Sequence, residues 1–206
     1  MPDFDLAALS AQERSRLLTR VVTPRPIALV STLNAAGQGN LAPFSYFNGG
    51  GQSPASCVFS ATRFRTGAGK HTLANIEATG DYVINLVTRA MAERVNTASF
   101  EYEEGTDEFD VAGFARAPSE RVRPPRVAES PVSLECRLFK VVPHGESPGS
   151  ANYVVGEIIL IHAADAVCVD GLPDERLIAP VARLGADRWA ELRPEGVFAY
   201  ARPSSP

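Results

Sequence analysis

Residues 39–54 read GNLAPFSYFNGGGQSP. The stretch begins with large apolar residues typical of a strand, but Pro43 interrupts it and residues 49–51 are all glycine. Proline has no N–H for a sheet ladder and is confined to edge strands and bulges. Two interpretations follow: a bulged edge strand that ends in a turn, or a backbone that must lie close to something flat.

The segments on either side favour strands over helices. Strand-like runs rich in β-branched and aromatic residues are separated by glycine- and proline-containing turns. These runs are residues 27–32, 41–48, 56–62, 81–87, 131–142 and 153–169. Helical patterns are confined to residues 10–19, 70–79 and 88–99.

This order of segments predicts a mainly β protein, a β-barrel with a few peripheral helices. A doubly wound parallel sheet is disfavoured because helices do not alternate with strands and no G-x-G-x-x-G opens a helix. Without an internal repeat or linker, residues 1–206 are expected to form a single domain with a short N-terminal helix and a C-terminal extension.

Several local signals make this prediction specific. Ser10 and Glu13 form a capping box for the first helix, and Gly80 is placed to end the second. Residues 132–139 alternate apolar and polar, which predicts a half-buried strand. Gly156 marks a bulge or a close approach of the chain. The acidic residues 101–110 are expected to form a solvated loop or a short helix.

Composition excludes several function classes. The net charge of −4 provides no basic surplus for binding nucleic acid, and no apolar run is long enough to span a bilayer. The three cysteines are far apart and predict reduced, buried thiols in a cytoplasmic protein. No metal site is expected, because the histidines and cysteines lack ligand spacing, and no G-x-S-x-G or Walker loop indicates a hydrolase.

The best local signal for a binding site is residues 63–76, RFRTGAGKHTLANI. Two arginines, two glycines and Lys70 lead directly into a helix start, where backbone N–H groups and the helix dipole favour an anion. Thr72 adds a hydroxyl group. The alternative is a solvated basic loop before an ordinary helix.

Together with residues 39–54, this segment makes the chain resemble the flavin reductase-like, FMN-binding split-barrel family. The resemblance extends in order from about residue 20 to residue 190. It rests mainly on TPRPIALVSTLNAAGQGNLAPFSYFN and KHTLANIEATGDYVINLV, while ESPVSLECRL, VVGEIILIH and RLGADRW support it. It implies a homodimeric split barrel that binds FMN, or less often FAD, near the dimer interface.

The resemblance also implies roles for individual residues. The backbone around residues 40–45 is expected to lie along the isoalloxazine edge, and the basic loop is expected to receive the phosphate. Arg25 is a weaker candidate. No catalytic side chain is predicted, and Ser60 has an ordinary strand contact as its alternative. The predicted cofactor-binding residues are Asn40, Leu41, Ala42, Pro43, Ser45, Ser60, Arg63, Arg65, Lys70 and Thr72.

The function that this implies is hydride transfer from NAD(P)H to flavin, with a small-molecule acceptor or a partner oxygenase taking the electrons. Two other functions stay open. One is a flavin-binding electron carrier without nicotinamide activity, and the other is a split-barrel oxidase with a dedicated small-molecule substrate.

Overall fold

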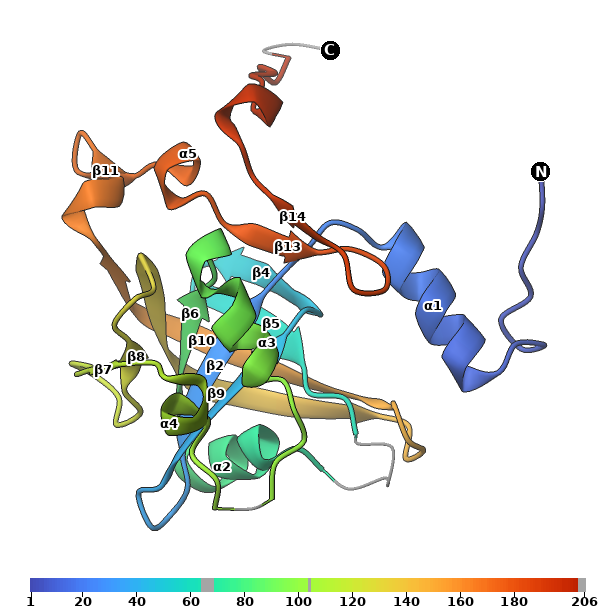
Figure 1. Cartoon of the computed structure of the whole chain (residues 1–206), viewed down its shortest axis with the longest axis horizontal. Helices are drawn as coiled ribbons and strands as arrows, with labels where there is room; N and C mark the ends of the chain where they lie inside the picture. Colours follow the sequence, from blue (N-terminus) through green and yellow to red (C-terminus); the bar gives the residue numbers. More distant parts are fainter. Residues whose placement is uncertain (64–68, 104, 204–206) are drawn as a thin grey trace.

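A seven-stranded antiparallel sheet forms the body of the protein in the computed structural model, which describes residues 1–63, 69–103 and 105–203 (Figure 1). The strand order is β3-β2-β6-β9-β10-β5-β4. The strands of this sheet are β2 (Ala28–Leu33), β3 (Gly39–Phe44), β4 (Phe47–Gln52), β5 (Ala55–Ser60), β6 (Asp81–Leu86), β9 (Val132–His144) and β10 (Ala151–Ala163).

The sheet closes on itself through the stretch that contains Pro43. Its two edge strands, β3 and β4, follow one another in the chain and are joined by Ser45 and Tyr46 alone. Because a two-residue connection holds both edges together, the sheet must curl into a barrel that is split at this point. The N–H of Ser60 donates to the carbonyl of Tyr46 at 2.8 Å and ties the split to β5. The predicted split barrel is confirmed.

Apolar side chains fill the barrel and cover one outer face. The interior holds Phe44 and Phe59, whose ring centroids lie 4.9 Å apart, together with Tyr82 and Ile84. A second core lies between β2, β3 and a helical layer (Figure 1). That layer consists of the 3₁₀ turn η1 (Arg89–Met91), α3 (Ala92–Thr97) and α4 (Glu108–Ala112).

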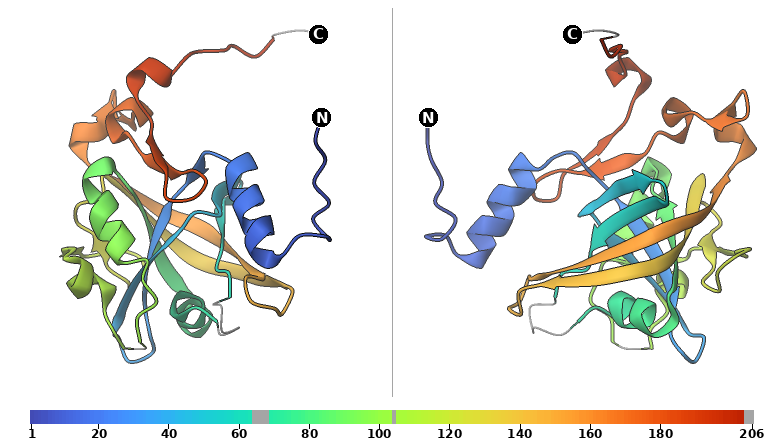
Figure 2. Two further views of the ribbon diagram at one scale, coloured as in Figure 1. Left: turned by 45° about the vertical axis from the view of Figure 1, so that its right-hand side comes forward. Right: turned by 180° about the vertical axis from the view of Figure 1, so that it is seen from behind.

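The helices that were predicted from capping signals are present. α1 (Ala11–Val21) begins with the Ser10–Glu13 capping box, and α2 (His71–Thr79) ends at Gly80, which has a φ of 75°. Thr88 precedes η1, but its side chain makes no capping hydrogen bond. α2 covers one end of the barrel, whereas α1 extends away from it (Figure 2). No helix among the described residues is long and apolar enough to cross a membrane.

Short elements complete the chain. β1 (Arg25–Pro26), β13 (Val181–Arg183) and β14 (Trp189–Glu191) form a three-stranded sheet beside the barrel. Two small hairpins pair β7 (Arg116–Ala117) with β8 (Arg126–Val127), and β11 (Cys168–Val169) with β12 (Leu172–Pro173). The remaining turns are η2 (Asp165–Val167), α5 (Glu175–Ile178) and η3 (Pro194–Gly196).

The glycine run belongs to a strand and does not form a turn. Residues 49–51 lie in β4, an exposed edge strand whose pairing with β5 shifts between Gly49 and Gln52. The turn comes later, at residues 53–54. The interpretation as a bulged edge strand therefore holds for these glycines, and they line none of the site described below.

Two sequence expectations about burial hold only in part: Arg137 and Phe139 are exposed as a half-buried strand requires, and the acidic segment contains the short helix α4. Ser133 and Glu135, the polar side of the predicted half-buried strand, are both buried, because the chain near residues 120–122 covers that face of β9. The acidic segment is not fully solvated either. Glu108 and Phe109 in α4 are buried against β3.

Candidate functional site

A cavity of about 220 Å³ opens beside the split of the barrel. One wall is β3 with Ser45 and Tyr46, and the next is the end of β5 at Ser60. The first residues of α2, with Lys70, close a third side, and residues 98–102 after α3 lie opposite. The cavity therefore joins the proline-containing stretch to the basic helix start, as the sequence predicted for a single site.

Pro43 has a structural explanation at this wall. The N–H of Leu41 points away from β2 and donates to Oε2 of Glu108 at 2.9 Å. Along an edge strand, alternate residues point their N–H groups away from the sheet, so Pro43 occupies the next outward position and needs no partner there. The wall beside Pro43 is therefore stiff and presents no competing donor at that residue.

A different side of the cavity is built around the start of α2. Lys70 occupies the N-cap position without a side-chain capping hydrogen bond, and its Nζ lies 3.7 Å from Oε1 of Glu101. Burial lowers the pKa of the Lys70 ammonium, and Glu101 opposes that shift. Nδ2 of Asn40 donates to Oγ1 of Thr72 at 2.9 Å, which fixes α2 to β3.

Ser60 supplies a polar atom for which the described part of the chain provides no partner. Its side chain is 6% exposed and lines the cavity, and within the described residues its Oγ has no hydrogen-bond partner. A buried hydroxyl without a partner is costly, so such a group commonly serves a bound molecule. The heteroatoms along one edge of a flavin ring would satisfy this hydroxyl, and the residues present fit the cofactor that the sequence implied.

Most of the predicted residues meet at this cavity. The predicted residues that line it are Asn40, Ala42, Pro43, Ser45, Ser60, Lys70 and Thr72. Leu41 does not, because its side chain is fully buried in the outer core. Arg63 lies outside the lining, and its backbone pairs with Ser150 and Gly149. Arg65 lies outside the described residues.

Arg25, the weaker candidate, has a structural role. Its guanidinium donates to the carbonyls of Thr19 and Val22 at the end of α1, at 2.7 and 2.8 Å, and to that of Leu184 at 3.1 Å. It does not line the cavity. Arg25 thus attaches the N-terminal helix to the loop after β13.

Two parts of the cavity were not predicted. Residues 98–102 contribute Phe100 and Tyr102, whose ring centroids lie 5.0 Å apart. Glu108 is buried at the cavity wall, and burial raises the pKa of its carboxyl, while the hydrogen bond from Leu41 acts in the opposite direction. An aromatic pair beside an acidic run was the available signal, but only the fold brings it to β3.

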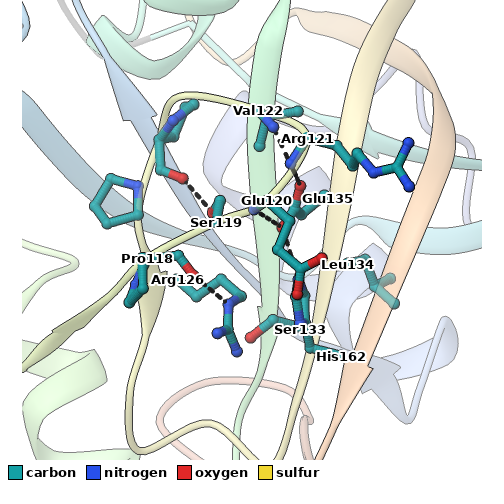
Figure 3. A network of polar contacts seen from close by, with 12 residues as sticks. Pro118, Ser119, Glu120, Arg121, Val122, Arg126, Ser133, Leu134, Glu135 and His162 are labelled. Carbon is teal, nitrogen blue, oxygen red and sulfur yellow. Dashed lines mark hydrogen bonds and ion pairs between the residues drawn. The ribbon is translucent and has the colours of Figure 1, made fainter.

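A second polar centre lies away from the cavity, on the outer face of β9 (Figure 3). The carboxylate of Glu135 is fully buried and accepts the N–H groups of Glu120, Arg121 and Val122 at 2.7, 2.6 and 3.1 Å. Nε2 of His162 lies 2.6 Å from Oε1 of Glu135. Burial alone would raise the pKa of Glu135, but these hydrogen bonds together hold it below its ordinary value.

The sequence of this chain matches a known family. The model of the flavin reductase like domain matches residues 19–170. An uncharacterized protein of Halalkalibacterium halodurans, BH2278, is 35% identical over 186 residues, which are 89% of each chain.

Two solved structures have the same fold. Component B of nitrilotriacetate monooxygenase from Bacillus cereus superposes with a TM-score of 0.88 at 26% identity, covering 93% of this chain and 96% of that one. A Shewanella frigidimarina protein with a split barrel domain superposes with a TM-score of 0.81 at 25% identity, covering 98% of this chain and all of that one. With three quarters of its length matched by the domain model and a cavity suited to the cofactor, this chain belongs to the flavin reductase-like family.

Proposed function

We propose that this protein binds FMN in the cavity beside Pro43 and reduces it with NADH or NADPH. The observation that carries the proposal is the meeting of the stiff edge 42–45, the orphan hydroxyl of Ser60 and the basic start of α2 around one cavity. The flavin ring would lie along the first two, and the phosphate would lie at Lys70 and Thr72, with FAD as the less favoured cofactor.

The chain's own residues would bind and orient the cofactor. When bound, flavin accepts a hydride from reduced nicotinamide and passes electrons on, so the protein needs no nucleophile. Ser60 would donate its buried hydroxyl to the ring edge, and Asn40 would hold α2 in place through Thr72. Lys70 would turn from Glu101 toward the phosphate as a point charge.

A homodimer is part of the proposal. No side chain of α1 is fully buried against the rest of the chain, and Phe198 and Tyr200 in the C-terminal segment are exposed. Exposed apolar groups on projecting segments favour burial against a second subunit. Light scattering should give twice the chain mass of 22.0 kDa, and a monomer that still binds FMN tightly would contradict the dimer.

The destination of the electrons is a free small molecule or a partner oxygenase. The second destination is supported by the similarity to component B of nitrilotriacetate monooxygenase. The alternatives are an electron carrier without nicotinamide activity and an oxidase with a dedicated substrate. Stopped-flow mixing of the FMN-loaded protein with NADH and NADPH separates the reductase from both alternatives. Only a reductase would lose its flavin absorbance on mixing with one of these donors.

The placement of the phosphate has its own test. Lys70→Ala should weaken FMN binding roughly ten- to a hundredfold, as expected for one charge-assisted contact. The matched control is Lys140→Ala, at the other, exposed lysine of the chain, which should bind FMN like the wild type. Riboflavin, which lacks the phosphate, should bind more weakly than FMN and lose little in the Lys70 variant. Unchanged FMN affinity in Lys70→Ala would rule out this placement.

A further inference from the structure

A second cavity of about 200 Å³ adjoins the first. The two share Pro43, Ser45 and Ser99 in their walls, so the edge 43–45 borders both. Cavities of about 150 Å³ already admit a benzene ring. A molecule in the second cavity would therefore lie beside whatever occupies the first, and it could contain one aromatic ring.

The far wall of the second cavity combines an indole ring with a cation. Arg183 and Trp189 are opposite residues on β13 and β14, and the guanidinium carbon lies 5.0 Å from the centre of the indole ring. Trp189 packs against the outer core, which fixes its ring. A flat apolar surface is thus joined to a positively charged group.

The charge on Arg183 is not neutralised within the described part of the chain. Its guanidinium donates to the carbonyl of Ala186 at 3.0 Å, but no ion pair joins it to a carboxylate there, although Asp187 acts on it from a longer distance. Its opposite residue on β1 is another cation, Arg25. Like charges in opposite positions destabilise a sheet, and a half-buried cation without an anion is costly. Both costs fall when an anion binds.

We propose that the second cavity binds a small planar aromatic carboxylate, with its ring beside Trp189 and its carboxylate on Arg183. This inference rests on the proposed function only for its position: the bound molecule would lie next to the flavin. The binding step itself needs only Arg183, Trp189 and the apolar residues around them.

The test uses benzoate as the probe and the full chain with and without FMN. Trp189 is the only tryptophan in the sequence, so its fluorescence reports on this cavity directly. Benzoate should change that emission and should give a calorimetric binding isotherm. Benzamide, which has the same shape without the charge, should bind at least about tenfold more weakly, since it lacks the charge-assisted hydrogen bond.

Two variants locate the site. Arg183→Gln should weaken benzoate binding by about tenfold or more and leave benzamide unchanged, whereas Arg193→Gln, at an exposed arginine nearby, should match the wild type. Asn96→Phe fills the cavity from α3 without changing Arg183 and should weaken both probes. Equal binding of benzoate and benzamide, wild-type affinity in Arg183→Gln, or no isotherm with benzoate would overturn the proposal. None of these outcomes depends on FMN binding, which the Lys70 titration measures separately.

Discussion

Nδ2 of Asn40 donates to Oγ1 of Thr72 at 2.9 Å, and both side chains are almost completely buried. This hydrogen bond joins β3 to the first turn of α2, the two walls between which the cavity lies. A parallel bond from Nδ2 of Asn75 to Oγ1 of Thr32, at 3.0 Å, attaches the same helix to β2. Buried side chains therefore fix the position of the helix start relative to Pro43.

Asn40→Ala should destabilise the protein by about 1–3 kcal/mol, because the hydroxyl of Thr72 loses its partner in a buried position. Thr72→Val should cost a similar amount, and the double variant should cost less than the sum by about 1 kcal/mol. Urea unfolding of the four proteins measures this coupling. Strict additivity would show that the bond contributes nothing to stability.

The sequence predicted the residues on two sides of this cavity, β3 and the start of α2, but not their contacts. Thr72 was predicted from a local signal, a helix start, whereas Asn40 was predicted from the resemblance to the flavin reductase-like family, and neither prediction says what the side chain contacts. Their hydrogen bond spans 32 positions and depends on how β3 and α2 pack. The same holds for Glu108, which lies 67 positions from Leu41 and is buried only because α4 packs on β3.

Glu108→Gln should leave the protein as stable as the wild type at neutral pH, or make it more stable. Burial raises the pKa of Glu108, so the folded state binds its proton more tightly than the unfolded state does. The wild type should therefore lose stability, relative to Glu108→Gln, as pH rises from the ordinary glutamate range through the raised pKa. Urea unfolding at several pH values between about 4 and 8 measures this difference.

The hydrogen bond to Leu41 provides the control for that experiment. Gln retains a carbonyl oxygen that can accept the N–H of Leu41, but Leu does not. Glu108→Leu should cost about 1–3 kcal/mol at every pH, because the backbone donor is left buried and unpaired. If Glu108→Gln is as damaging as Glu108→Leu at neutral pH, the carboxylate is required in its charged form and the expected direction is wrong.

The pH dependence of stability expected at Glu135 is the opposite of that expected at Glu108. The groups around its carboxylate donate to both oxygens, and in Gln one of these oxygens becomes an NH₂ that cannot accept the N–H groups facing it. Glu135→Gln should cost about 3 kcal/mol at neutral pH. Because the folded state lowers the pKa of Glu135, its stabilisation is present above the ordinary glutamate pKa and is lost as pH falls through the lowered value.

The penalty of Glu135→Gln should accordingly shrink as the protein is acidified. His162→Ala should cost less than Glu135→Gln, because the three backbone donors keep the carboxylate charged. A penalty that is independent of pH would mean that shape, and not charge, holds the chain near residues 120–122 on β9.

The burial of Glu135 also shows where alternation stops being informative. Residues 132–139 alternate as a half-buried strand should, and the register of β9 agrees with that pattern. Alternation says which side chains share a face, but it does not say what covers that face. Here a loop with its own N–H groups to satisfy covers the polar side, and a buried carboxylate is its partner (Figure 3).

Gly156→Ala should be the most damaging small substitution in the barrel. A methyl group at this position would lie 1.7 Å from the hydroxyl oxygen of Tyr82 and 3.0 Å from the carbonyl oxygen of Arg137. Tyr82 is fully buried and packs against Phe59, so its ring has no room to move. The expected cost is about 3 kcal/mol, at the upper end for overpacking a core.

The matched control is Gly49→Ala, also in a strand, where a methyl group would meet nothing within 4 Å. It should change stability by no more than about 0.5 kcal/mol. Tyr82→Phe removes the atom closest to the new methyl group, so the double variant should recover part of the loss in urea unfolding. No recovery would mean that the ring itself, whose Cζ would lie 2.7 Å from the methyl group, or the backbone of β9 excludes a side chain at Gly156. Full recovery would assign the close approach, which the sequence predicted at this glycine, to that hydroxyl alone.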